Sequence, residues 1–97
     1  MTRHPDPDVE ASVALLRDER MAGAGKKPSA ILRALLETPF GARGWTRSGQ
    51  LGRIYIVWRG FDVPLADAMT VAGWWAPTDP GAPLSDERLD ELLTRAP

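Results

Sequence analysis

The 97-residue sequence contains no cysteine and a single histidine, His4. Without cysteine it has no disulfide, no thiolate metal ligand and no cysteine nucleophile, which fits a reducing compartment. One histidine close to the N-terminus gives neither a Ser-His-Asp arrangement nor a His/Cys metal cluster. We therefore expect no enzymatic activity, no cofactor and no bound metal.

Long hydrophobic runs are also missing, and the longest apolar stretches fall far below the ~18–20 residues of a membrane span. The first residues, Met1 to Asp6, have no apolar run that would indicate a signal peptide. With 43% apolar and 26% charged residues, the composition is that of an ordinary globular protein. These features predict one domain over residues 1–97, with residues 1–5 disordered, and a cytoplasmic location.

Acidic residues are absent between Pro39 and Gly60, where four arginines lie together with Trp45, Tyr55 and Trp58. The 38 residues before this stretch carry six basic and six acidic side chains, and the residues from Phe61 onward carry a charge of −5. The net charge of −1 therefore hides a basic, aromatic middle and an acidic C-terminal part. This sorting of charge suggests a protein that binds a partner, without identifying it.

Four helices are expected from capping residues and apolar spacing. Asp6 and Pro7 are typical of a helix start, and this helix should end among residues 22–25, where two glycines disfavour continuation. A short apolar helix should begin at Pro28-Ser29 and end before Pro39. The third should run from Pro64 to near Gly73, and the last, capped by Ser85, should run to Arg95 with Leu89, Leu92 and Leu93 inward.

Between the second and third helices the sequence favours a β-hairpin. Residues 54–58, Ile-Tyr-Ile-Val-Trp, are rich in β-branched and aromatic side chains, and Gly44–Thr46 is a plausible partner strand. Residues 48–52 have turn chemistry. The predicted fold class is therefore α+β, with four short helices around a small antiparallel hairpin in the order α-α-β-β-α-α.

The function of this hairpin depends on its register. A five-residue loop would turn Ile54, Ile56 and Trp58 inward and gather on the other face Arg43, Trp45, Arg47, Arg53, Tyr55 and Arg59. A four-residue loop would instead pair Trp45 with Ile54 and bury it, which removes the main aromatic from the basic face. The first register predicts a surface suited to phosphates, stacked bases or acidic side chains.

Two further features bear on binding. Trp74 and Trp75 are adjacent, so we expect one to close the core and the other to lie at the surface, where an exposed tryptophan is typical of a binding hot spot. The last helix carries four acidic residues, which we expect to point to water and to contribute solubility: Asp86, Glu87, Asp90 and Glu91.

The sequence thus predicts a small non-enzymatic binding module or inhibitor that engages a larger protein or nucleoprotein complex. Its size and lack of chemistry are typical of small bacterial or phage regulatory proteins. The expected partner-binding residues are Arg43, Trp45, Arg47, Arg53, Tyr55, Arg59, Trp74 and Trp75. The alternative is a nucleic-acid-binding regulator, in which residues 43–59 act as the wing of an arrangement that resembles a winged helix. A dimerising domain remains a third interpretation.

Overall fold

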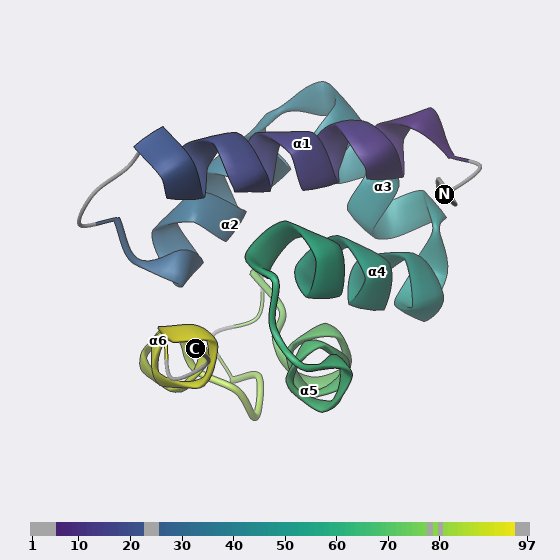
Figure 1. Cartoon of the computed structure of the whole chain (residues 1–97). Helices are drawn as coiled ribbons and strands as arrows, with labels where there is room; N and C mark the ends of the chain where they lie inside the picture. Colours follow the sequence, from purple (N-terminus) through teal and green to yellow (C-terminus); the bar gives the residue numbers. More distant parts are fainter. Residues whose placement is uncertain (1–5, 23–25, 78, 80, 95–97) are drawn as a thin grey trace.

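The computed structural model describes residues 6–22, 26–77, 79 and 81–94. They form six α-helices (Figure 1): α1 (Pro7–Ala22), α2 (Pro28–Glu37), α3 (Pro39–Arg47), α4 (Gly49–Phe61), α5 (Leu65–Trp74) and α6 (Asp86–Thr94). The expected disorder of residues 1–5, the glycines that were to end the first helix and Arg95 lie outside the described residues. Within the described part of the chain, no helix has the length and apolar character needed to cross a bilayer.

The predicted α+β fold is wrong, because no residue that the structure describes lies in a β-strand. The segment interpreted as a hairpin, residues 43–59, belongs to α3 and α4. Because there is no hairpin, the predicted register, the basic hairpin face and the wing of the alternative interpretation are wrong as well.

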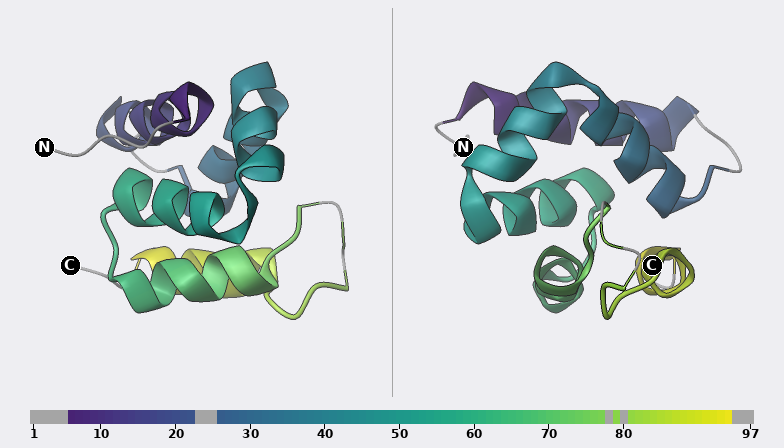
Figure 2. Two further views of the ribbon diagram at one scale, coloured as in Figure 1. Left: turned by 90° about the vertical axis from the view of Figure 1, so that its right-hand side faces the viewer. Right: turned by 180° about the vertical axis from the view of Figure 1, so that it is seen from behind.

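Tertiary burial explains why residues 54–58 are helical despite their β-branched side chains. The buried positions of α4 follow a helical repeat, not an alternation: Gly52, Ile56, Val57, Gly60 and Phe61. α4 lies between α1 and α5 (Figures 1 and 2), so it needs a buried face on both of these sides. The intrinsic preference for a strand is weak and yields to this packing.

Two glycines permit helices α3 and α4 to approach α1 closely. A Cβ on Gly60 would lie 2.5 Å from Leu16 Cδ1, and a Cβ on Gly44 would lie 3.2 Å from the carbonyl oxygen of Asp8. The sequence placed Gly44 in the predicted partner strand. In the structure both glycines are helical contact points, where a side chain would clash at Gly60 and would be crowded at Gly44.

Proline and glycine also divide the middle of the chain into separate helices. Thr38 adopts an extended conformation, and its side chain accepts a hydrogen bond from Gly41 N, so it caps α3 while Pro39 occupies the first turn. Gly49 has a φ of 71°, a conformation that glycine adopts without strain, and it separates α3 from α4. Pro39 therefore ends one helix, as expected, and also begins another.

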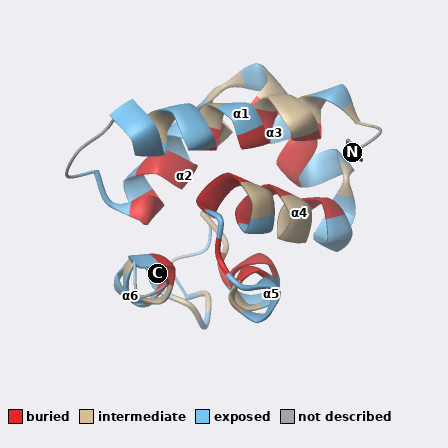
Figure 3. Ribbon diagram, in the orientation of Figure 1, coloured by how far each residue is buried: buried red, intermediate tan, exposed pale blue. Residues whose placement is uncertain are grey.

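Buried residues from all six helices form one core, and Figure 3 shows the buried segments of the ribbon in red. The core includes two tryptophans, Trp45 of α3 and Trp75 just after α5, which are 5% and 4% exposed. Their rings meet edge to face with centroids 6.1 Å apart. This pair links the α3 region to the C-terminal part of the molecule.

Helix α6 closes the core through Leu89 and Leu93, which are buried as the sequence predicted. We expected all four acidic side chains of this helix to point to water, but two of them, Asp86 and Asp90, form hydrogen bonds within the molecule. Asp90 accepts hydrogen bonds from Ser29 N (2.7 Å) and Ser29 Oγ (3.0 Å). Because Lys27, at the N-cap of α2, has no side-chain capping bond, Asp90 caps that helix from a distant part of the chain.

Asp86, at the start of α6, accepts hydrogen bonds from Arg33 and from the indole N–H of Trp75 (3.0 Å). These hydrogen bonds, that of Arg33 first, lower the pKa of Asp86. The guanidinium of Arg33 also lies 5.4 Å from the centre of the Trp75 ring. This carboxylate therefore joins α2, the segment after α5 and α6.

Candidate interaction surface on helices α4 and α5

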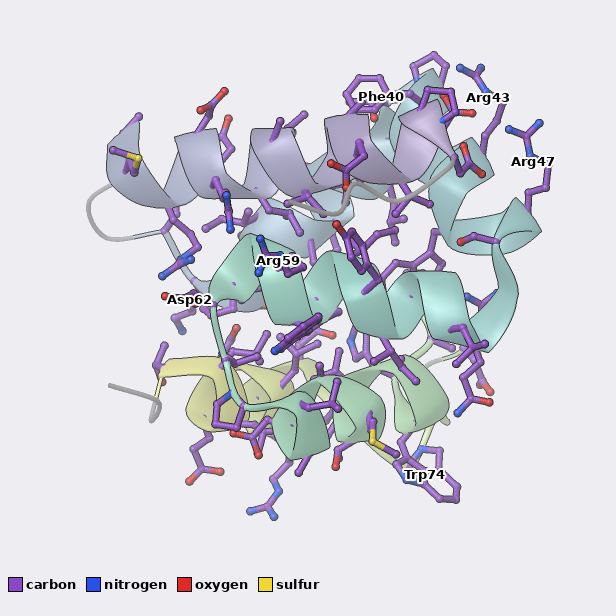
Figure 4. The ribbon with its side chains drawn as sticks, turned by 45° about the vertical axis from the view of Figure 1, so that its right-hand side comes forward. Phe40, Arg43, Arg47, Arg59, Asp62 and Trp74 are labelled. Carbon is purple, nitrogen blue, oxygen red and sulfur yellow. The ribbon has the colours of Figure 1, made fainter. Side chains whose placement is uncertain are left out.

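Arg43 and Arg47, two of the arginines predicted to bind a partner, are paired within the chain. Both come from α3 and converge on Asp8 of α1, with Arg43 Nε–Asp8 Oδ2 at 3.1 Å and Arg47 Nη2–Asp8 Oδ2 at 3.0 Å. The hydrogen bond from Arg43 lowers the pKa of Asp8, and the same bond raises the pKa of Arg43. We call these three residues the arginine corner (Figure 4).

Arg53 and Tyr55 of α4 also have partners inside the molecule. Arg53 Nε donates to the carbonyl oxygen of Trp45 at 2.7 Å, and its guanidinium lies 5.7 Å from the centre of the Trp45 ring. The Tyr55 hydroxyl donates to Glu10 Oε2 at 2.8 Å. These side chains join α4 to α3 and α1, which is a structural role.

Arg59 lies at the C-terminal end of α4, where its guanidinium sits 5.4 Å from the centre of the Trp58 ring. Its carbonyl oxygen accepts a hydrogen bond from Arg17 Nε (3.1 Å), and that of Gly60 accepts one from Arg20 Nη1 (3.0 Å). The last carbonyls of a helix carry partial negative charge, so these two arginines complement the end of α4.

The two adjacent tryptophans have different environments. Trp75 is in the core, whereas Trp74 is 58% exposed. Figure 4 shows Trp74 pointing away from the molecule at the end of α5, far from the labelled Arg43 and Arg47. The structure therefore does not bring the eight predicted partner-binding residues to one surface.

The exposed residues of α4 and α5 form a surface of another kind. Five exposed residues of α5 and the half-buried Thr70 form a surface that we call the α5 outer face: Leu65, Ala66, Met69, Thr70, Gly73 and Trp74. Asp67, which is half-buried like Thr70, lies at its edge beside Trp74. Three residues of this face are large and apolar, with Leu65 49%, Met69 51% and Trp74 58% exposed. The Thr70 hydroxyl donates to the carbonyl oxygen of Ala66 at 3.1 Å, so it already has a partner.

None of the exposed residues of α4 and α5 is charged, whereas Arg53, Arg59 and Asp67 are half-buried. Each of the other four helices has at least one exposed charged side chain, for example Arg17 on α1, Arg33 on α2, Arg47 on α3 and Glu87 on α6. In α4 the exposed residues include Leu51 and Trp58, which are 81% and 38% exposed. Thus five of the six large hydrophobic residues that are exposed in the described chain lie on two neighbouring helices.

An open hollow of about 490 Å³ lies along the α5 outer face. It is lined by Gln50 of α4 together with five residues of α5: Ala66, Met69, Thr70, Gly73 and Trp74. The small residues Ala66 and Gly73 leave space between the larger side chains of Met69 and Trp74. A hollow with both polar and apolar lining, bordered by an exposed tryptophan, is a place where a partner side chain can bury surface.

Apolar spacing in the sequence predicts that Leu65 and Met69 share one face of this helix with Ala68 and Ala72. The structure buries Ala68, Val71 and Ala72 and leaves Leu65 and Met69 exposed. The signal that was present is the near absence of charge: Asp67 is the only charged residue between Val63 and Pro77. A helix that is apolar on both sides needs a second buried contact or a partner.

The surface has no catalytic or metal-binding group. Among the described residues, no cluster of three or more His, Cys, Asp or Glu side chains is arranged to hold a metal ion. The chemistry that the surface can perform is the burial of apolar area against another molecule.

Comparisons with known proteins give no independent assignment. No family model matches the chain. The search of curated proteins and the search of solved structures also returned no match.

Proposed function

We propose that this chain is a non-enzymatic protein-binding module whose docking surface is the α5 outer face. The observation that carries the proposal is that α5 has five exposed residues, none of them charged, of which three are large and apolar. An exposed apolar helix face costs solubility when nothing covers it, and patches of this kind mark interaction sites.

The character of the surface favours a protein over a nucleic acid. Binding to phosphates requires several free cations, and the α5 outer face has none. The Arg43 and Arg47 side chains are held by Asp8, so they are less able to supply those cations. Trp74 provides large apolar area with little loss of side-chain entropy, which is typical of the centre of a protein interface.

The same docking surface suits an inhibitor, because a small module bound to a larger protein can block that protein's activity without catalytic groups of its own. The proposal places the module in the cytoplasm, on the absence of cysteine from the sequence.

The test is photo-crosslinking from the docking surface. A photoreactive phenylalanine replaces Trp74 in the full chain, and a matched control carries it at Glu87, which is exposed on α6. We expect a discrete crosslinked product from position 74 only, whose mass and peptides show whether the partner is a different protein or another copy.

The identified partner is then bound to purified wild-type chain and to Trp74→Ala. We expect Trp74→Ala to weaken binding at least about tenfold, which corresponds to about 1.4 kcal/mol. The affinity should change little with salt, since no ion pair is lost on the face. Equal crosslinking from positions 74 and 87, or an unchanged affinity in Trp74→Ala, would contradict the proposal.

A further inference from the structure

Arg17 and Arg20 are exposed arginines of α1 that form no ion pair with any carboxylate the structure describes. They are three residues apart on one helix, so their side chains lie on the same face. Their charge is therefore not offset by a carboxylate, in contrast to that of the arginine corner. The ion pairs within the described part of the chain belong to other cations: Lys26, Arg33, Arg43, Arg47 and Arg88.

Backbone carbonyls hold both guanidiniums in place without cancelling their charge. Arg17 Nε donates to the carbonyl oxygen of Arg59, and Arg20 Nη1 donates to that of Gly60. A guanidinium has several N–H donors, so each keeps a two-pronged edge that no described residue bonds: Nη1 and Nη2 on Arg17, Nε and Nη2 on Arg20. Paired N–H groups in this fixed geometry match the oxygens of a phosphate group.

The two arginines line an open hollow where α1 meets the end of α4. Its volume is about 340 Å³, and its lining also includes Met21 and Asp62. Figure 4 shows Asp62 and Arg59 at this end of α4. The volume lies at the small end of the range for small-molecule sites, which suits a phosphate group with a compact organic part.

We propose that Arg17 and Arg20 form a binding site for the phosphate group of a small ligand. The observation that carries the proposal is the pair of anchored guanidiniums, each with a two-pronged edge left for a ligand, beside this hollow. None of the described lining residues belongs to α5, so the site is separate from the α5 outer face and goes beyond the proposed function.

The charges around the hollow favour an anion, and Asp62 opposes it. Two guanidinium charges stand against one carboxylate and a partial charge of about −0.5 at the C-terminal end of α4. Of the other acids nearby on α1, Glu19 is paired with Lys26. Asp18 points about 100° away from Arg17 around the helix. The hollow is therefore positive overall, and removal of the charge on Asp62 should strengthen the binding of phosphate.

The experiment is two-dimensional ¹H–¹⁵N NMR of the arginine Nε–H groups in the full chain, titrated with inorganic phosphate and with glycerol phosphate at constant ionic strength. We expect the signals of Arg17 and Arg20 to shift and to saturate, with a dissociation constant of about 1 mM or lower. Tighter binding of glycerol phosphate identifies a phosphorylated metabolite as the ligand, and equal or weaker binding identifies free phosphate. Shifts that do not saturate by about 50 mM of either compound overturn the inference.

Three variants distinguish this site from a general attraction of anions. Arg20→Gln should weaken phosphate binding at least about tenfold, because it removes charge-assisted hydrogen bonds. Asp62→Asn should tighten phosphate binding about two- to fivefold, because it removes the opposing charge. Asp62 has a φ of 55°, a conformation that asparagine tolerates. Arg88→Gln on α6, where Arg88 pairs with Glu91, is the matched control and should bind phosphate like wild type.

Unchanged phosphate binding in Arg20→Gln overturns the inference, and so does an equal loss in Arg20→Gln and Arg88→Gln, because only net charge would then matter. Arg20→Gln also loses the bond to Gly60. If circular dichroism shows that this variant does not fold, Asp62→Asn decides: tighter binding supports the site, and unchanged or weaker binding overturns it. The proposed function is tested separately, by crosslinking from position 74, and stands or falls on that result.

Discussion

The arginine corner and the α5 outer face lie on opposite sides of α4, and their side chains have different partners. In the arginine corner, Arg43 and Arg47 meet Asp8, and Arg47 also lies 3.7 Å from Asp6, so opposite charges that are far apart in the sequence pair within the fold. On the α5 outer face, Leu65, Met69 and Trp74 remain about half exposed. The charged side chains of the first region have partners within the molecule, whereas the apolar side chains of the second remain in contact with water.

This difference teaches that charge counted along a sequence does not measure charge that is free to bind. The acid-free stretch from Pro39 to Gly60 draws its partners from elsewhere: Asp8 for two of its arginines and Glu10 for Tyr55. An apolar helix face that lies next to solvent is a better sign of a binding site than a run of arginines. Arginines can form ion pairs within the fold, whereas exposed apolar side chains have no such partner in water.

The largest predicted effect separates core and surface tryptophans. Trp45→Ala should destabilise the protein by about 3–5 kcal/mol, because it leaves a cavity beside Trp75. Trp74→Ala should change the free energy of unfolding by less than about 0.5 kcal/mol, since its side chain is mostly in water. Urea unfolding of the two variants tests this. Similar losses in both would mean that Trp74 supports the fold.

The second prediction uses a matched pair of glycines. Gly60→Ala should destabilise the protein by about 1–3 kcal/mol, because the new Cβ would lie 2.5 Å from a side chain that is fully buried, Leu16. Gly73→Ala should be neutral or stabilising by up to about 1 kcal/mol, because its Cβ meets only Gln50 Nε2 at 3.5 Å and alanine favours helix. Thermal unfolding of both variants distinguishes them. A strongly destabilised Gly73→Ala would show that the outer face is tightly packed already.

The third prediction concerns the two neighbouring acids of α6. Asp90→Ala should cost about 1 kcal/mol, because it removes the cap from α2 at Ser29. Glu91→Ala should cost less than about 0.5 kcal/mol, because its carboxylate pairs with Arg88 on the surface of the same helix, in an ion pair with both side chains 72% exposed. Chemical denaturation measures both values, and equal losses would rule out the capping role.

The smallest effect is expected in the pH dependence of stability. Because the bonds from Arg33 and Trp75 lower the pKa of Asp86 below its ordinary value of 3.8, the unfolded state binds its proton first as the pH falls. This contribution is therefore full above the unfolded pKa and is lost as the pH falls through the lower folded pKa.

The Asp86 side chain is 38% exposed, so solvent screening reduces the effect, and Asp86→Asn should cost less than about 1 kcal/mol near neutral pH. The difference from wild type should shrink below about pH 4, as unfolding curves at the two pH values would show. A difference that grows on acidification would contradict the assigned sign.

Local signals in the sequence were sufficient for some elements. Asp6 and Pro7 predicted the start of α1, and Ser85 predicted that of α6, where Arg88 N donates to Ser85 Oγ. The inward stripe of Leu89 and Leu93 followed from helical spacing. Capping and periodicity are interactions between residues close in sequence, so a single sequence contains them.

The remainder depended on contacts between distant segments. Burial of α4 against both α1 and α5 overrides the strand preference of residues 54–58, and neither helix is visible from that segment alone. The sequence placed one residue of the Trp74-Trp75 pair at the surface without deciding which. The partner of Arg43, Asp8, lies 35 residues away, so a charge pattern could not show that this arginine is engaged.

The most direct test of the docking surface is ¹⁹F NMR of the full chain labelled with 5-fluorotryptophan, in which each tryptophan is assigned by its replacement with phenylalanine. As the complex forms with the partner identified by crosslinking, we expect the signal of Trp74 to shift and those of the buried Trp45 and Trp75 to stay in place. A Trp74 signal that is unchanged when the complex is saturated would contradict the account.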